Sequence, residues 1–95
     1  MVSGAALADS PALMTIRFNQ KNVAYQNKLS DVAHQALAIK STAVFEVLDV
    51  SANGQGTKGQ EVAESLAKSG IPAAQVTVSS QAGEVTNEEV RVFVR

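Results

Sequence analysis

Lys58 to Val78, KGQEVAESLAKSGIPAAQVTV, is the most informative stretch of the chain for its secondary structure. Its first half places apolar residues at the i, i+1, i+4, i+5 spacing of one helix face: Val62, Ala63, Leu66 and Ala67. Gly70 stands where a helix ends in the left-handed conformation, and Pro72 cannot continue the helix. Val76 and Val78 then alternate with polar residues, as in a half-buried strand. The stretch therefore predicts a helix, a glycine stop, a turn fixed by proline and a strand.

Similar patterns predict the remaining elements on either side of this stretch. Residues 13–18 alternate like a half-buried strand, and residues from about 23 to 40 carry a helical apolar stripe that includes Tyr25 and Leu29. Residues 43–50 are rich in β-branched and aromatic side chains and predict a central strand. Residues 89–95 alternate and predict the last strand, which a hairpin-like connector over 82–87 joins to the strand before it.

The order of these elements predicts an α+β fold, a two-layer α/β sandwich. The order is β-α-β-α-β-β, so strands joined through helices should run parallel and the final pair antiparallel. We expect one mixed four-stranded sheet with both helices on one face. The other face should be wetter and is the candidate partner surface, unless it is simply a surface of mixed charge; its members are Arg17, Arg91, Phe93 and Arg95.

Composition excludes several classes of function. The chain has 95 residues with 45% hydrophobic and only 4% aromatic content, which predicts one domain with a light core. Eight basic and nine acidic residues give a net charge of -1, so we expect no nucleic acid partner. The chain has no cysteine, which excludes a disulfide, a thiolate metal site and a cysteine nucleophile. Residues 1–12 predict a flexible N-terminal lead, and residues 13–95 the domain.

The candidate chemical groups are few, and we expect no enzyme, no catalytic residue, no cofactor and no metal. His34 is the only histidine and is interpreted as a solvated or boundary helix residue. Residues 54–59 match G-x-G-x-x-G by spacing, but without the context of a nucleotide fold, so they are interpreted as a flexible lead-in to a helix. One alternative function is nevertheless a ligand-binding or enzymatic domain that uses this loop and His34. Glu84, Glu88 and Glu89 are interpreted as a solvated acidic loop.

The Gly-Ile-Pro-Ala turn at residues 70–73, with its preceding helix and following strand, resembles OmpA-like periplasmic domains. Residues 16–19, 45–54 and 87–95 are similar to that family's first strand, central strand with binding loop, and closing strand. Members that hold peptidoglycan use an Asp in a Thr-Asp loop and an Arg on the second helix to grip diaminopimelate. Here Ser51-Ala52-Asn53 replaces Thr-Asp, and Lys58 stands near the Arg position without its bidentate fork.

This resemblance implies a non-enzymatic cell-envelope domain that mediates protein–protein assembly, as part of a secretion or conjugation apparatus. It implies a periplasmic location, associated with the outer membrane in the full-length lipoprotein through an N-terminal anchor that this chain lacks. Other envelope proteins would be its partners. The alternative that the resemblance implies is a peptidoglycan-binding domain with an altered ligand loop, in which Asn53 and Lys58 bind the ligand.

Overall fold

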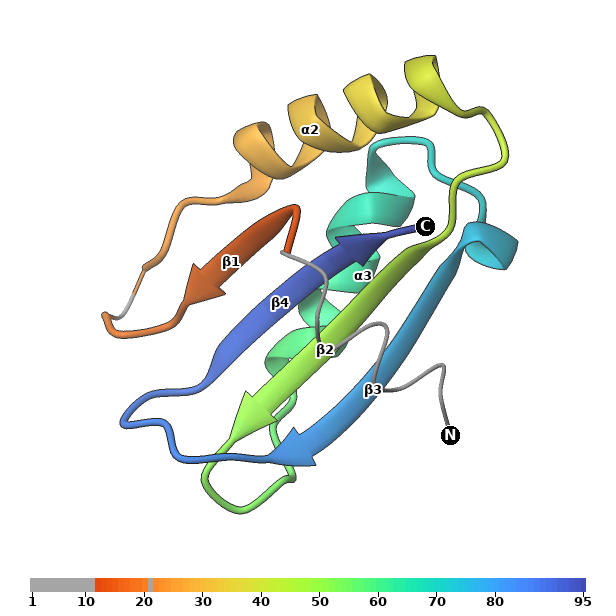
Figure 1. The fold of residues 1–95 in the computed structure, drawn as a ribbon. Helices are drawn as coiled ribbons and strands as arrows, with labels where there is room; N and C mark the ends of the chain where they lie inside the picture. The colour runs from red at the N-terminus through yellow and green to blue at the C-terminus, as the bar shows by residue number, and fades with distance from the viewer. Residues whose placement is uncertain (1–11, 21) are drawn as a thin grey trace, which may run out of the picture.

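A computed structural model describes residues 12–20 and 22–95 (Figure 1). It shows the predicted α+β fold, with two helices against a mixed four-stranded sheet. The flexible lead expected at residues 1–12 lies outside the described residues, apart from residue 12. The elements are β1 (Met14–Arg17), α2 (Gln26–Ile39), β2 (Phe45–Ser51), α3 (Lys58–Lys68), the short 3-10 helix η1 (Ala73–Gln75), β3 (Val76–Ala82) and β4 (Glu89–Val94).

The strand order β1-β4-β2-β3 places the last strand in the middle of the sheet. β2 and β3 are parallel, and β4 runs antiparallel to both β1 and β2. The predicted hairpin-like connector is therefore wrong, because β2 separates β3 from β4. Val90 and Val92 are fully buried in β4, whereas β3 consists largely of exposed polar residues. The apolar strand takes the covered central position and the polar strand takes an edge.

The core lies between the sheet and the two helices, and Figure 1 shows α3 behind the sheet. α3 packs against β2, β3 and β4, and α2 packs against α3. Val62 and Leu66 of α3 are fully buried, as the helical spacing predicts. Each such side chain contributes about 1.5–3 kcal/mol when it is removed from water. Ala63 is partly buried and Ala67 is exposed, so the buried stripe is narrower than predicted. The sheet contributes Ile16, Phe45, Val47, Val90 and Val92 to the same cluster.

The glycine stop is confirmed at the end of α3. Gly70 has a φ of 95°, which is the left-handed region that favours glycine. The Gly70 N–H donates to the Ala67 carbonyl at 3.0 Å, and the Ile71 N–H donates to the Leu66 carbonyl at 3.1 Å. These two bonds satisfy carbonyl groups that the end of the helix leaves without partners.

The first helix begins at Gln26, later than the predicted start near residue 23. Tyr25 has a φ of -131°, outside the helical range. Its ring is buried and packs edge-on against Phe18, with 5.8 Å between the ring centroids. This tertiary contact fixes the entry to α2. No helix among the described residues is long and apolar enough to cross a membrane.

Candidate functional site

Arginines gather on the sheet face that points away from the helices. Glu89 Oε1 lies 3.8 Å from Arg17 Nε, and Glu89 Oε2 accepts a hydrogen bond from Arg91 Nε at 2.6 Å. Arg95 Nε pairs with Glu46 in the neighbouring strand. We call Arg17, Arg91 and Arg95, with Glu46 and Glu89 between them, the arginine face.

The arginine face exposes its cations more than its anions. The side chains of Arg17, Arg91 and Arg95 are 70%, 38% and 66% exposed. Those of Glu89 and Glu46 are 12% and 17% exposed. Exposed ion pairs contribute only about 0–1 kcal/mol each, so stabilising the fold is not their main effect. The glutamates contact each guanidinium group at its Nε atom. The terminal N–H groups of a guanidinium form a fork that matches the geometry of carboxylates.

Phe93 does not join the arginines as an accessible group. It lies on the same sheet face, opposite Glu46, but it is only 7% exposed. Its strand is central, with β1 on one side and β2 on the other. The expectation of an accessible Phe93 in the partner surface is therefore wrong. The three arginines remain candidates for that surface.

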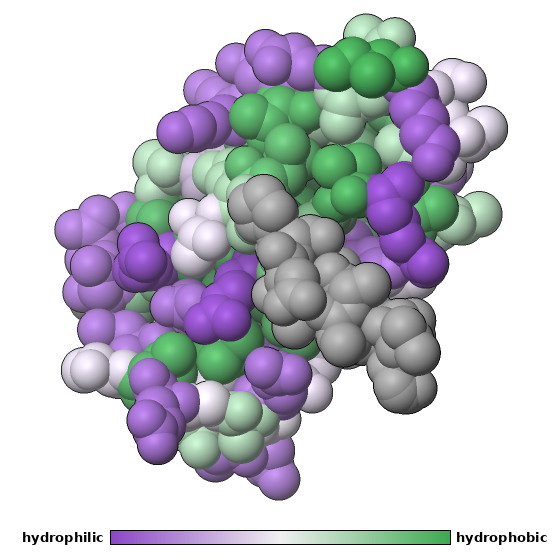
Figure 2. Space-filling model, in the orientation of Figure 1, coloured by the Kyte–Doolittle hydropathy of each residue, from purple (hydrophilic) through white to green (hydrophobic). Residues whose placement is uncertain are grey.

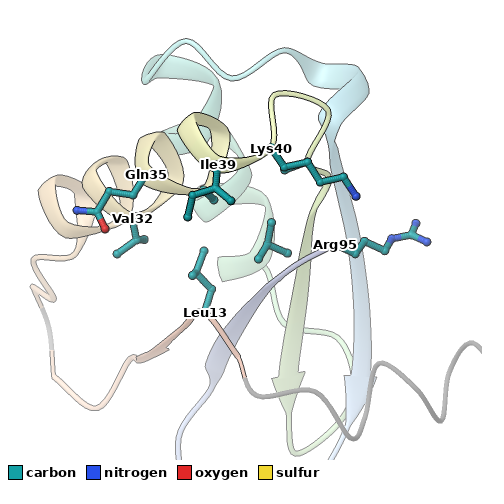
Figure 3. A pocket seen from close by; sticks show the side chains of 9 residues that line it. Leu13, Val32, Gln35, Ile39, Lys40 and Arg95 are labelled. Atoms are coloured by element: carbon teal, nitrogen blue, oxygen red, sulfur yellow. The ribbon is translucent and has the colours of Figure 1, made fainter.

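An apolar groove lies next to the arginine face, between α2 and the ends of β1 and β4. Its volume is about 310 Å³. Figure 2 shows hydrophobic residues gathered along α2 at this place. In Figure 3 the side chains of Leu13, Val32 and Ile39 converge, whereas those of Lys40 and Arg95 extend outward at one end. Ile39 is 88% exposed. Arg95 thus belongs to both the groove and the arginine face.

The residues of the expected ligand loop do not share one hollow. Asn53 Oδ1 accepts hydrogen bonds from the Gln55 N–H at 2.9 Å and from Ser51 Oγ at 3.3 Å, so it closes its own loop. Lys58 Nζ lies 3.4 Å from Glu61 Oε1 and 5.3 Å from the centroid of the Phe18 ring. A polar hollow of about 450 Å³ beside Lys58 is lined by Phe18, Asn22, Val23, Ala24, Gln26, Lys58 and Glu61.

Two carboxyl groups cap the start of α3. Asp49 Oδ2 accepts the Gly59 N–H at 2.7 Å, and Glu88 Oε2 accepts the Lys58 N–H at 2.9 Å. Burial, together with the neighbouring Asp49 carboxyl, raises the pKa of Glu88. Carboxyl groups of the chain itself therefore occupy these helix N–H donors. This arrangement is opposed to phosphate binding by the glycine loop, which needs the same donors.

A second polar contact joins the start of α2 to α3. The Tyr25 hydroxyl donates to Glu61 Oε2 at 2.7 Å. Burial and this bond raise the pKa of Tyr25 to about 12. The same bond lowers the pKa of Glu61, because it stabilises the carboxylate form.

His34 is a residue of α2 and lies beside the C-terminal end of α3, whereas the glycine loop lies at its N-terminal end. Its Nε2 donates to the Ser69 carbonyl oxygen at 2.9 Å, just beyond the last residue of the helix. The glycine loop lies before the first residue of that helix. The structure therefore separates His34 from the loop by the length of α3, about 16 Å at 1.5 Å per residue. These residues do not form a common site.

The sequence suggested that the acidic residues near β4 form a solvated loop, but the structure shows otherwise. Glu84 is exposed, but Glu89 is buried beside two arginines and Glu88 caps α3. Asp49 was missed, although a signal was present: it shares the inward side of its strand with Phe45 and Val47. A carboxylate at such a position needs hydrogen-bond partners. No sequence signal pairs it with Glu88, since β3 and the connector to β4 separate the two.

Comparison with known proteins adds no relative: no family model matches the chain, and no curated protein matches it. Within residues 12–20 and 22–95, no group of three or more His, Asp or Glu side chains could hold a metal ion.

Proposed function

We propose that this chain is a non-enzymatic protein-binding domain of the cell envelope, which docks a partner protein in a secretion or conjugation apparatus. The observation that carries the proposal is the continuity of two surfaces through Arg95. One is the arginine face, and the other is the apolar groove that Ile39 and Val32 line. Its full-length form would lie in the periplasm, associated with the outer membrane, as the resemblance to OmpA-like domains implies.

The chemistry of this surface suits a protein segment. Protein interfaces combine an apolar centre with a polar rim, and arginine is enriched among the residues that dominate binding energy. The groove offers room for one bulky apolar side chain. The exposed guanidinium groups of Arg17 and Arg95 offer donors to carboxylates. The expected partner segment carries acidic residues next to a bulky apolar residue.

The test is retention of envelope proteins on the immobilised domain. Solubilised envelope proteins from the cells of origin are passed over wild type, over Arg17→Gln/Arg95→Gln and over Lys28→Gln/Lys68→Gln. The last variant is the matched control, because it removes two exposed cations from α2 and α3. Arg91 is left in place so that buried Glu89 keeps its 2.6 Å partner.

We expect quantitative mass spectrometry to find a protein that wild type and the lysine variant retain and the arginine variant loses. Its retention should also weaken as salt rises, because exposed charge pairs are screened. Equal retention by both double variants would contradict docking through the arginine face.

Peptidoglycan binding remains a second candidate because a polar hollow lies beside Lys58. Lys58 and Glu61 put a cation and an anion at this hollow, a pairing that suits an amino acid zwitterion such as the end of diaminopimelate. Asn53 lies outside the hollow and takes no part. Sedimentation with purified sacculi tests this function: binding by wild type and by Lys28→Ala, but not by Lys58→Ala, would support it. Failure of wild type to sediment would exclude it.

A further inference from the structure

Asp49 is a buried acid with one oxygen that lacks a partner. The residue is 1% exposed in the central strand β2. Its Oδ2 accepts the Gly59 N–H at 2.7 Å. Its Oδ1 is buried and accepts no hydrogen bond from the described residues. A buried carboxylate oxygen in this state is costly, so the site calls for a further donor.

Glu88 is placed to supply that donor. A methyl group on Gly56 would overlap both Asp49 Oδ1 and Glu88 Oε2, so these two oxygens flank the same glycine. Two ionised carboxylates beside the same glycine would repel each other, and neither could donate. With one proton on Glu88 the pair becomes a donor and an acceptor, and Asp49 Oδ1 gains its partner.

We propose that Asp49 and Glu88 form a proton-operated latch. Protonated Glu88 donates to Asp49 Oδ1 and holds the β3–β4 connector, residues 83–88, against the start of α3. Loss of that proton releases the connector. The raised pKa of Glu88 agrees with this geometry, since burial and the nearby Asp49 carboxyl both favour the protonated form.

The surrounding charges set the direction of the pH dependence. From α3, Lys58 favours ionised Glu88 through its charge and its backbone N–H, but burial and Asp49 outweigh it. The Lys58 ammonium also lies by Glu61, and Glu89, the next residue in the chain, pairs with Arg17 and Arg91. A group whose pKa is raised by folding stabilises the closed form at low pH. The latch therefore weakens as pH rises through the pKa of Glu88.

The latch is also connected to the arginine face through the chain. Glu88 directly precedes Glu89, whose carboxylate orients Arg17 and Arg91. Release of the connector would free the start of β4 and disturb that orientation. This consequence rests on the proposed function, whereas the latch itself does not.

The experiment is an NMR titration of the whole chain labelled with carbon-13 in its carboxyl groups, with amide hydrogen exchange across the same pH range. Glu88→Gln mimics the protonated acid, because its amide can donate to Asp49 at every pH. Asp49→Asn can donate to ionised Glu88, so it should lower the pKa of Glu88. Glu84→Gln is the matched control, an exposed glutamate on the same connector.

We expect Glu88 to titrate above the ordinary range for glutamate. Protection of the Lys58 and Gly59 amides should fall with its deprotonation, about tenfold for each pH unit that separates the Glu88 pKa from its ordinary value. Glu88→Gln should abolish this pH dependence, and Glu84→Gln should leave it unchanged.

Three results would overturn the proposal. The first is a Glu88 that titrates in the ordinary range. The second is a pH profile of protection that is the same in wild type and Glu88→Gln. The third is a connector that closes on addition of Mg²⁺ or Ca²⁺ and not on protonation. If Glu88→Gln does not fold, the Glu88 titration in Asp49→Asn still decides, because an unchanged pKa there refutes the bond.

Discussion

Replacing Gly56 with alanine tests the packing of the two acids at the start of α3. The added methyl group would overlap Asp49 Oδ1 and Glu88 Oε2 and lie 2.7 Å from Glu88 Cδ. Asp49 cannot move away, because it is buried and held by the Gly59 N–H. Glu88 is only half-buried and must yield, which breaks its bond to the Lys58 N–H.

The expected change in the free energy of unfolding follows from the hydrogen bond that Glu88 loses. The bond that Glu88 loses involves a carboxylate in either state: its own when it is ionised, or that of Asp49 when Glu88 is protonated. Such a bond contributes about 1.5–3 kcal/mol, and a smaller unfolded-state entropy returns about 0.4–1 kcal/mol. Gly56 is not among the glycines with positive φ, so alanine adds no backbone strain. We expect Gly56→Ala to lower the free energy of unfolding by about 2 kcal/mol, a large share of the stability of a small domain.

The assay is urea unfolding followed by circular dichroism. Gln55→Ala, an exposed change in the same loop, is the control and should stay within about 0.5 kcal/mol of wild type. In a Glu88→Ala background Gly56→Ala should cost less, because one of the two overlaps is gone. The reasoning is refuted if Gly56→Ala is as stable as Gln55→Ala, or if its cost is the same in both backgrounds.

Two further predictions concern the helix contacts. Tyr25 is the only tyrosine, so ultraviolet absorbance should show it ionising near pH 12 in the folded protein and near its ordinary value of about 10 in urea. Its contribution to stability is present below that ordinary value and lost as pH rises through the folded pKa; a folded midpoint near 10 would contradict the burial of Tyr25 and its bond to Glu61. Leu66→Ala opens a cavity at a fully buried position and should cost about 2–5 kcal/mol in urea unfolding, whereas Ala67→Ser on the exposed side of α3 should change little; equal midpoints would contradict the packing of α3.

Local sequence patterns predicted the elements well where one interaction dominates. The apolar spacing of Val62 and Leu66 fixed the buried side of α3, and Gly70 ended the helix as its conformational freedom requires. The place of β4 could not be read from the connector, because both β2 and β3 were possible neighbours. The high burial of Val90 and Val92 decides between them, and that burial is a property of the whole sheet.

The candidate site was predictable only in part. The alternation of the strands predicted Arg17, Arg91 and Arg95 on one face. The structure joins Arg17 to Arg91 through Glu89, whereas Arg95 pairs with Glu46. The same alternation made Phe93 look accessible, although the ring is covered. The Asp49–Glu88 pair depends on contacts between residues 39 positions apart, which no local pattern encodes.

Site-specific photo-crosslinking in the cells of origin tests the central claim of docking most directly. Benzoylphenylalanine replaces Ile39 in the apolar groove, Arg95 at its junction with the arginine face, or Glu64 on the exposed side of α3. We expect one discrete envelope protein to be crosslinked from positions 39 and 95 and not from position 64. Crosslinking of that protein from position 64 alone, or no crosslink from either docking position, would contradict it.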